Sequence, residues 1–386
     1  MTPSHSSLHP DAIVIGGGII GSSIALRLAQ AGLRVSVFDR GEPGAEASSA
    51  AAGMIAPQGE KTGSQPFGEL CWASHGLYPE FVAEVEHLSG QEVGYRRDGT
   101  LLVALDVDQA REIDEIEAAQ VRRGAAVERL SPESIWRRVP GLATGILGAL
   151  FLPADHWVDN ERLTAALVEA ARRSGAEFHR QNVVSIEVRD GRVASILAER
   201  GRFSAGEFIL AAGCWSGALA ASAGLETVTV PCRGQMIELE IESGLPQAEQ
   251  VAQVLRAGHH YLVPRAGGRV IVGTTSEYVG FEKTVTAAGL GSVLQGALGL
   301  APFLADARFV RAWAGLRPDT VDHLPILGAS GITGLTLATG HFRNGILLAP
   351  ITARLIADRV MSGRSPSTLE PFQADRFPLM TAVDGN

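Results

Sequence analysis

The sequence contains few cysteines, no dense cluster of positive charge and no long apolar run. The three cysteines, Cys71, Cys214 and Cys232, show neither a C-x-x-C pair nor another metal-ligand spacing, so we expect no metal site and reduced thiols in a reducing cytoplasm. The net charge of −9 argues against a nucleic-acid partner. The uncharged apolar segment at residues 12–26 is short and glycine-rich for a membrane span. Residues 1–10 lack the basic start and apolar core of a signal peptide.

The chain does contain a large apolar fraction and many glycines. Its 386 residues are 46% hydrophobic and 19% charged and include 45 glycines, a composition that is ordinary for a loop-rich α/β enzyme. The length suggests two or three domains. We therefore expect a multidomain α/β enzyme without internal repeats.

The most informative stretch is residues 11–40, which we interpret as strand, glycine turn, helix and strand. The turn at 16–21 has the spacing G-x-G-x-x-G, which permits a tight turn, close approach of a pyrophosphate and close helix–strand packing. The helix is expected over 19–31. Asp39 ends the second strand, where an acidic side chain accepts hydrogen bonds from a ribose. The motif predicts a dinucleotide site but does not separate NAD from FAD, and a glycine turn between packed elements is the alternative.

Residues 45–57 are nearly all small. Ser48 and Ser49 are candidates to cap a helix around 49–52 and to offer hydroxyls and amides to phosphate. Small residues also let a backbone lie flat against a planar ring. The alternative is a flexible surface loop.

Later parts of the chain indicate a second sheet and a return to the first. The strand expected over 202–210 runs into Ala-Ala-Gly-Cys-Trp-Ser at 211–216, near the carboxyl ends of a doubly wound sheet, where ligands bind. Residues 227–242 begin a β-rich region with antiparallel strands. The regular part of the last helix is expected to begin at Pro350, because proline lacks the donor of an interior helical hydrogen bond. Residues 365–386 are expected to form a loose tail.

Seven motifs in order resemble the D-amino-acid oxidase superfamily of FAD enzymes, most closely its glycine oxidase branch. They are GGGIIG at 16–21, SSAAAGM at 48–54, AAGCWS at 211–216, RGQ at 233–235, YLVPR at 261–265, WAGLRPDT at 313–320 and GHFRNGILLAP at 340–350. The resemblance covers roughly residues 11–359, and the last string is the most specific.

The resemblance implies a Rossmann-type α/β FAD-binding domain that is discontinuous, with an α+β substrate domain built on a mixed or antiparallel sheet. The expected FAD-binding domain comprises 11–80, 150–220 and 311–363; the substrate domain comprises 81–149 and 221–310; flexible tails are expected at 1–10 and 365–386.

The resemblance also implies which residues bind FAD. Ile19 and Ile20 match pyrophosphate contacts, and Val183 matches a backbone contact to adenine. Residues 341–347 match a loop and helix start that face the flavin, where backbone N–H groups would stabilise negative charge. The full expected set is Gly16, Gly18, Ile19, Ile20, Gly21, Asp39, Arg40, Ala47, Ser48, Ala52, Gly53, Met54, Val183, Gly213, His341, Phe342, Arg343, Asn344, Gly345, Ile346 and Leu347.

The substrate implied by the resemblance is an amino acid, whose carboxylate needs a planar bidentate donor such as arginine. Arg317 matches that residue, and Arg343 matches a second arginine near the substrate; a surface ion pair is the alternative for each. Tyr261 matches an active-site tyrosine and His259 a polar pocket residue; otherwise they would be a half-buried strand residue and a surface histidine. Ser276 stands where a larger apolar residue is expected, which would widen the pocket and favour a D-amino acid with a side chain over glycine.

The implied reaction is oxidative deamination of glycine, sarcosine or a small D-amino acid. A hydride passes from the substrate Cα to flavin N5, oxygen is reduced to hydrogen peroxide, and the imino product is hydrolysed or captured, as in thiamine thiazole synthesis. FAD is expected to be noncovalent, because no cysteine lies between Arg317 and Gly345. The alternatives are a dehydrogenase with a quinone or protein acceptor, and an FAD-binding subunit of a larger complex. A homo-oligomer remains an option.

Overall fold

A six-stranded sheet forms around the strand that precedes the glycine turn. The computed structural model describes residues 9–59, 64–226, 229–242 and 251–377. In the first sheet the strands run in parallel except for the edge strand β18, which is antiparallel. Their spatial order is β18 (Ile326–Ala329), β19 (Leu335–Thr339), β12 (Glu207–Leu210), β1 (Ala12–Ile15), β2 (Val35–Asp39) and β8 (Glu177–Arg180).

Both faces of this sheet are covered, as the apolar sequence of β1 predicts. Side chains alternate along a strand, so Ala12 and Val14 face one core while Ile13 and Ile15 face another. The first core is made with four mutually packed helices, and the second lies beneath a small antiparallel sheet and α7 (Ser216–Ser222). The helices are α1 (Ile19–Gln30), α3 (Gln65–Ser89), α6 (Asn160–Arg173) and α10 (Gly345–Ser362); the small sheet is β9 (Val183–Arg189), β10 (Arg192–Ala198) and β11 (Gly201–Phe203).

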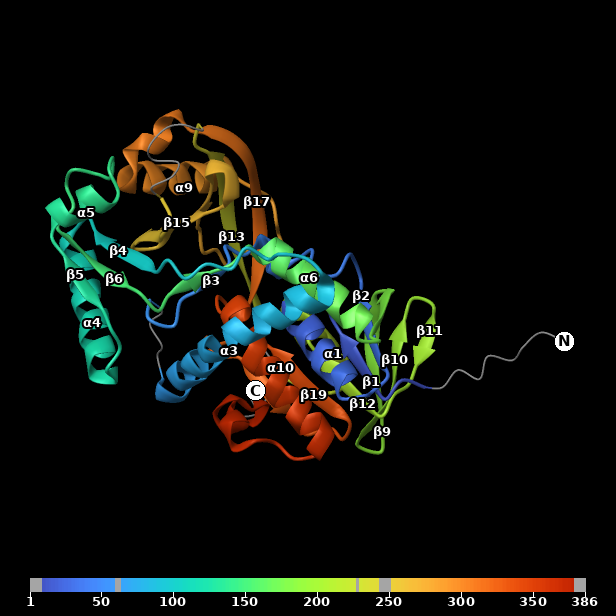
Figure 1. The fold of residues 1–386 in the computed structure, drawn as a ribbon. Helices are drawn as coiled ribbons and strands as arrows, with labels where there is room; N and C mark the ends of the chain where they lie inside the picture. Colours follow the sequence, from blue (N-terminus) through green and yellow to red (C-terminus); the bar gives the residue numbers. More distant parts are fainter. Residues whose placement is uncertain (1–8, 60–63, 227–228, 243–250, 378–386) are drawn as a thin grey trace, which may run out of the picture.

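An eight-stranded mixed sheet forms the other large part of the molecule (Figure 1). Its described pairs are antiparallel except β4 with β14. The order is β17 (Arg308–Asp319), β13 (Val230–Glu240), β16 (Arg269–Gly273), β15 (His260–Pro264), β14 (Val254–Ala257), β4 (Thr100–Ala104), β6 (Gly148–Leu152) and β5 (Glu128–Leu130). Helices α9 (Ala287–Leu300) and α5 (Pro132–Arg138) contribute to one core, and α4 (Val107–Arg123) to a second.

Long strands β13 and β17 run from the eight-stranded sheet toward the six-stranded one (Figure 1). They pair over their full length, with Gly234 opposite Gly315 and Cys232 opposite Arg317. A short ribbon of β3 (Met54–Ile55) and β7 (His156–Trp157) lies between the two large sheets. The expected fold class, α/β with a mixed second sheet, is confirmed.

The division into the expected residue ranges stays a prediction, and four elements cross its borders: α3, β6, α7 and β17. Helix α3 continues past residue 80 to Ser89, and its Phe81 and Val85 belong to the core of the six-stranded sheet. Strand β6 crosses the border at 149/150 and pairs with β4 throughout. Residues 1–8, 227–228 and 378–386, which include parts of both expected tails, lie outside the described residues.

Two local expectations are wrong. The segment after 365 is not a loose tail as far as residue 377, because Leu369 and Phe372 are 0% and 1% exposed and pack in the helical core. Helix α10 begins at Gly345 rather than at Pro350, which lies inside it. Within the described ranges, no helix is both long enough and apolar enough to cross a membrane.

Candidate functional site

A cavity of about 480 Å³ lies where the two large sheets meet. It is lined by the glycine turn, by the segment from 38 to 54, by residues 211–215 and by the start of α10. From the eight-stranded sheet come residues of β13, β15 and β17. All but two of the expected FAD-binding residues line it, the exceptions being Gly21 and Leu347.

The glycine turn follows the expected geometry. Gly16 has φ +105°, and a Cβ there would lie 2.4 Å from the carbonyl oxygen of Ala211. Gly21 packs against the turn instead of facing the cavity. A Cβ added there would lie 1.9 Å from the oxygen of Gly16, so only glycine fits. The third glycine therefore brings helix and turn together, whereas Gly16 and Gly18 leave their backbone open to the cavity.

Asp39 is held by backbone amides next to the turn. Its Oδ2 accepts from Gly17 N at 2.7 Å and its Oδ1 from Gly41 N at 2.9 Å. Burial raises the pKa of Asp39, and the two amides oppose that shift. Each carboxylate oxygen has a second lone pair, which leaves acceptor capacity for a ribose hydroxyl.

Arg40 stacks on an aromatic side chain that sequence reasoning did not single out. Its Cζ lies 3.5 Å from the ring centroid of Trp215, and it forms an ion pair of 2.5 Å with Glu46. Trp215 lines the cavity and also lies beside Phe281, with ring centroids 5.6 Å apart. The signal for it was present in the AAGCWS motif, of which only Gly213 was selected.

Ser48 plays a different part from the expected cap. Helix α2 (Ala47–Ala50) contains Ser48 inside it, and its N-cap Glu46 makes no side-chain capping bond. The Ser48 Oγ accepts from Ile19 N at 2.9 Å, at the first turn of α1. The serine therefore fixes the small-residue segment against the helix terminus that faces the cavity.

The start of α10 presents free backbone donors. Asn344 is the N-cap and makes no side-chain capping bond, so the first N–H groups of the helix keep their capacity for an anion or a carbonyl. His341 is 3% exposed, its Nε2 lies 3.1 Å from Thr352 Oγ1, and burial lowers its pKa to about 3. His341 therefore stays neutral at physiological pH.

Arg317 lies in the cavity with its guanidinium held from one side. Its Nη2 donates to Thr274 Oγ1 at 2.7 Å and its Nη1 to the Thr275 carbonyl at 3.2 Å. A Cβ on Gly234 would lie 2.3 Å from Nη2, so the glycine makes room for the guanidinium. No ion pair of Arg317 occurs among the described residues, which leaves this half-buried cation available to a carboxylate.

Two other expected substrate residues also line the cavity. Tyr261 is 5% exposed and its ring passes over Gly273, where a Cβ would lie 2.4 Å from the ring. Its hydroxyl lies 3.8 Å from the Sδ of Met236, a lining residue that the sequence analysis missed. Arg343 is exposed at the cavity edge.

His259 and Ser276 do not lie where they were expected. His259 is exposed in the turn after β14, outside the cavity lining. Ser276 is exposed too, with its Oγ 3.2 Å from Cys232 Sγ. Thr274, the first residue after β16, lines the cavity instead, and its hydroxyl accepts from Arg317. The argument that Ser276 widens the pocket therefore loses its basis.

Comparisons with known proteins agree with this arrangement. Residues 11–359 match the model of the DAO family, FAD dependent oxidoreductase. The bifunctional protein ThiO/ThiG of Trichormus variabilis is 38% identical over 368 residues, which cover 95% of this chain and 55% of that protein. The chain thus spans about half the length of several curated relatives that it matches.

Solved structures extend the likeness to the whole fold. The crystal structure of glycine oxidase from Geobacillus kaustophilus has a TM-score of 0.90 and 32% identity, covering 96% of this chain and 99% of that one. Iminodiacetate oxidase from Chelativorans has a TM-score of 0.86 and 32% identity, covering 94% and 98%. With the cavity, the glycine turn and the match over residues 11–359, the chain belongs to the DAO family of FAD-dependent oxidoreductases.

Proposed function

We propose that this enzyme oxidatively deaminates glycine, sarcosine or a small D-amino acid. The observation that carries the proposal is the half-buried guanidinium of Arg317 in the cavity, positioned by Thr274 and Thr275 and without a carboxylate partner among the described residues. A guanidinium in that state favours a bidentate carboxylate ligand.

The residues present fit the cofactor of the family. The glycine turn and the α1 terminus suit a pyrophosphate, Asp39 suits a ribose, and the small residues 50–53 leave room for a planar ring. When bound, FAD supplies the acceptor for a hydride from the substrate Cα and passes the electrons to oxygen, giving hydrogen peroxide.

The chain's own part is to hold and orient the substrate. Arg317 binds the carboxylate, and Tyr261 with Met236 forms an apolar wall beside it. The neutral amine's lone pair assists departure of the hydride, so the reaction does not require a side-chain base. The free N–H groups at the α10 start favour negative charge nearby. The imino product then reacts with water to give an oxo acid and ammonia.

The relatives support this substrate class. The Geobacillus kaustophilus relative is named glycine oxidase, and its sequence is 33% identical over 95% of this chain and 97% of that protein. The relatives named bifunctional protein ThiO/ThiG are compatible with a second fate that the family resemblance implies for the imino product, capture in thiamine thiazole synthesis.

A substrate panel tests the proposal. Purified holoenzyme is assayed with glycine, sarcosine and small D-amino acids for peroxide release and for bleaching of the flavin without oxygen. Peroxide with at least one of these supports an oxidase. Bleaching with negligible oxygen uptake would instead identify a dehydrogenase with another acceptor. If the panel gives neither peroxide nor flavin bleaching, the result would indicate an FAD-binding subunit of a larger complex.

The Arg317→Leu variant tests the clamp itself. We expect KM to rise by the equivalent of about 2–5 kcal/mol, the cost of a lost buried charge pair, with FAD content unchanged. Arg317→Lys should recover part of the loss, because lysine keeps the charge but not the planar fork. An unchanged KM in Arg317→Leu would refute this role.

A further inference from the structure

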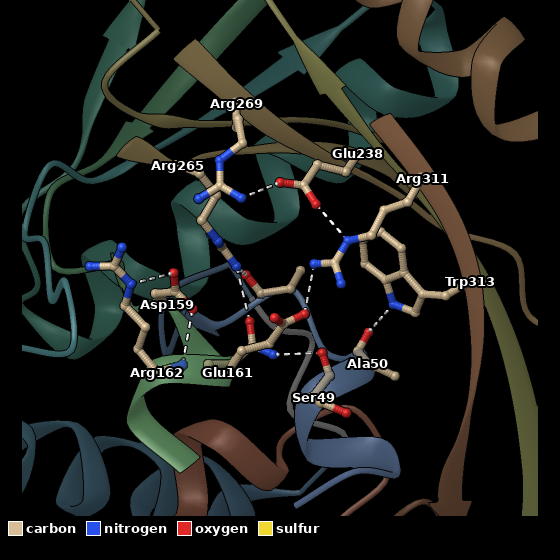
Figure 2. A network of polar contacts seen from close by, with 12 residues as sticks. Ser49, Ala50, Asp159, Glu161, Arg162, Glu238, Arg265, Arg269, Arg311 and Trp313 are labelled. Atoms are coloured by element: carbon tan, nitrogen blue, oxygen red, sulfur yellow. Dashed lines mark hydrogen bonds and ion pairs between the residues drawn. The ribbon is translucent and has the colours of Figure 1, made fainter. Parts of the chain in front are cut away.

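Arg265, the last residue of the YLVPR motif, has no part in the cavity lining. It follows β15, and its Nη2 donates both to the Ala52 carbonyl and to Asn160 Oδ1, each at 2.9 Å (Figure 2). Burial lowers its pKa from the usual arginine value. The neighbouring Glu238 is engaged by Arg269 and Arg311, at 2.9 and 2.6 Å. No ion pair of Arg265 occurs in the described part of the chain, so its cation serves a backbone carbonyl.

Asn160 and Trp313 hold the same segment from behind. The Asn160 side chain, whose residue is 2% exposed, donates through Nδ2 to the carbonyls of Ser48 and Ser49 at 2.8 and 3.0 Å. Trp313 Nε1 donates to the Ala50 carbonyl at 3.2 Å. Four carbonyls between 48 and 52 are thus held by three side chains of α6, β17 and the end of β15.

These bonds decide where the intervening N–H groups point. In a trans peptide the carbonyl of one residue and the N–H of the next point in opposite directions. The carbonyls of Ala50 and Ala52 face the scaffold, so the N–H groups of Ala51 and Gly53 face away from it. Both residues line the cavity. The N–H groups of Ser49 and Ala50 are used within the turn, by the Gly44 and Glu46 carbonyls.

We propose that Arg265, Asn160 and Trp313 are positioning residues that fix the N–H groups of Ala51 and Gly53 as donors to an acceptor atom of FAD. None of the three side chains lines the cavity, so they act through the backbone that they hold. A donor that is already oriented costs no reorganisation when the acceptor becomes more negative. This inference rests on FAD binding and not on the identity of the substrate.

Apoprotein titrated with FAD tests the proposal without any substrate. In Arg265→Gln and Asn160→Ala we expect FAD to bind about 10- to 100-fold more weakly, the range of a lost hydrogen bond to a charged group. The flavin reduction potential should fall, because the donors stabilise the more negative, reduced form. Arg265→Lys should recover part of both changes. Hydrogen exchange in the apoprotein should accelerate at residues 51–53.

Arg269→Gln is the matched control. It removes a neighbouring guanidinium that bonds Glu238 and not the 48–52 segment, so FAD affinity and potential should be unchanged. Trp313→Phe keeps a ring but removes only the donor to Ala50, and serves if the polar variants do not fold. Wild-type affinity and potential in Trp313→Phe and Arg265→Gln would overturn the proposal, as would equal losses in Arg269→Gln. A holoenzyme that oxidises none of the amino acids would contradict the proposed function, but it would not affect the measurements of FAD affinity and flavin potential.

Discussion

The Tyr78 hydroxyl donates a 2.6 Å hydrogen bond to the carbonyl oxygen of Ile346. In a regular helix that carbonyl would accept from residue 350, which is proline and has no N–H. One residue further on, Ser74 Oγ donates to the Leu347 carbonyl at 2.6 Å and accepts from Ile351 N at 3.4 Å. Two side chains of α3 thus bond the backbone groups that lack their regular helical partners near Pro350. The helix therefore extends back to Gly345, at the cavity.

Tyr78→Phe should measurably destabilise the protein. The variant leaves a buried carbonyl without a donor, because Tyr78 is 0% exposed, and we expect a loss of about 1–3 kcal/mol in the free energy of unfolding. Denaturant unfolding of the holoenzyme measures it. Tyr95→Phe, which removes a less buried hydroxyl beside His156, is the comparison and should cost less. Equally small losses of unfolding free energy in both variants would contradict the role of Tyr78 in stabilising the start of α10.

Gly234→Ala should displace the Arg317 guanidinium. The added methyl would lie within 2.3–2.6 Å of three guanidinium atoms, closer than side-chain carbons are found in proteins. We expect KM for the amino acid to rise at least about tenfold, equivalent to about 1.4 kcal/mol, while FAD stays bound. Steady-state kinetics with flavin absorbance measures both quantities.

Gly299→Ala is the control for that substitution. Gly299 lies in α9 and nothing is found within 4 Å of its Cβ position among the described residues, so alanine should leave KM unchanged. It should stabilise the helix by about 0.5–1 kcal/mol. Similar KM values for Gly234→Ala and Gly299→Ala would show that the methyl group beside Arg317 does not impair substrate binding.

His156 should make the protein less stable in mild acid. Burial and the positive charges that His75 and Arg97 can carry lower its pKa to about 4, while an unfolded histidine titrates near 6.5. Between these two pKa values the histidine is protonated in the unfolded chain and neutral in the folded chain. The free energy of unfolding therefore falls as pH falls, by about 1.4 kcal/mol per pH unit. His156→Asn should therefore lose about 2 kcal/mol less than wild type between pH 7 and pH 5. Urea unfolding at both values measures this; equal losses would exclude His156 as the source.

FAD should leave the denatured protein completely. Noncovalent FAD is expected because no cysteine is close to Arg317 in the sequence. Cys214 nevertheless lines the same cavity, where its Sγ donates to the Leu316 carbonyl at 3.3 Å. Burial raises the pKa of Cys214 to about 12, which keeps the thiol protonated and unreactive at neutral pH. After acid precipitation, all flavin fluorescence should appear in the supernatant. A yellow pellet with a mass increase on the Cys214 peptide would show a covalent link.

Sequence reasoning worked where local pattern and local geometry coincide. The glycine turn, α1 and the acid at Asp39 could all be read from one 30-residue stretch, because each depends on neighbours in the chain. The family motifs further predicted the lining by Arg317, Tyr261 and the α10 start.

The failures depend on contacts between distant segments. The start of α10 was missed because its repair comes from Tyr78, 268 residues away. Ser276 and Thr274 are two residues apart, and the one that lines the cavity and accepts a hydrogen bond from Arg317 is Thr274. Arg265 and Asn160, 105 positions apart, carry no local signal of the segment that they jointly hold.

Strand β17 carries both Trp313 and Arg317, four positions apart and therefore on the same face. Trp313 donates to the Ala50 carbonyl, and Arg317 lines the cavity. In the proposed roles, one strand therefore positions both the cofactor and the substrate. Because both side chains extend from one strand, a displacement of β17 would move both proposed contacts together.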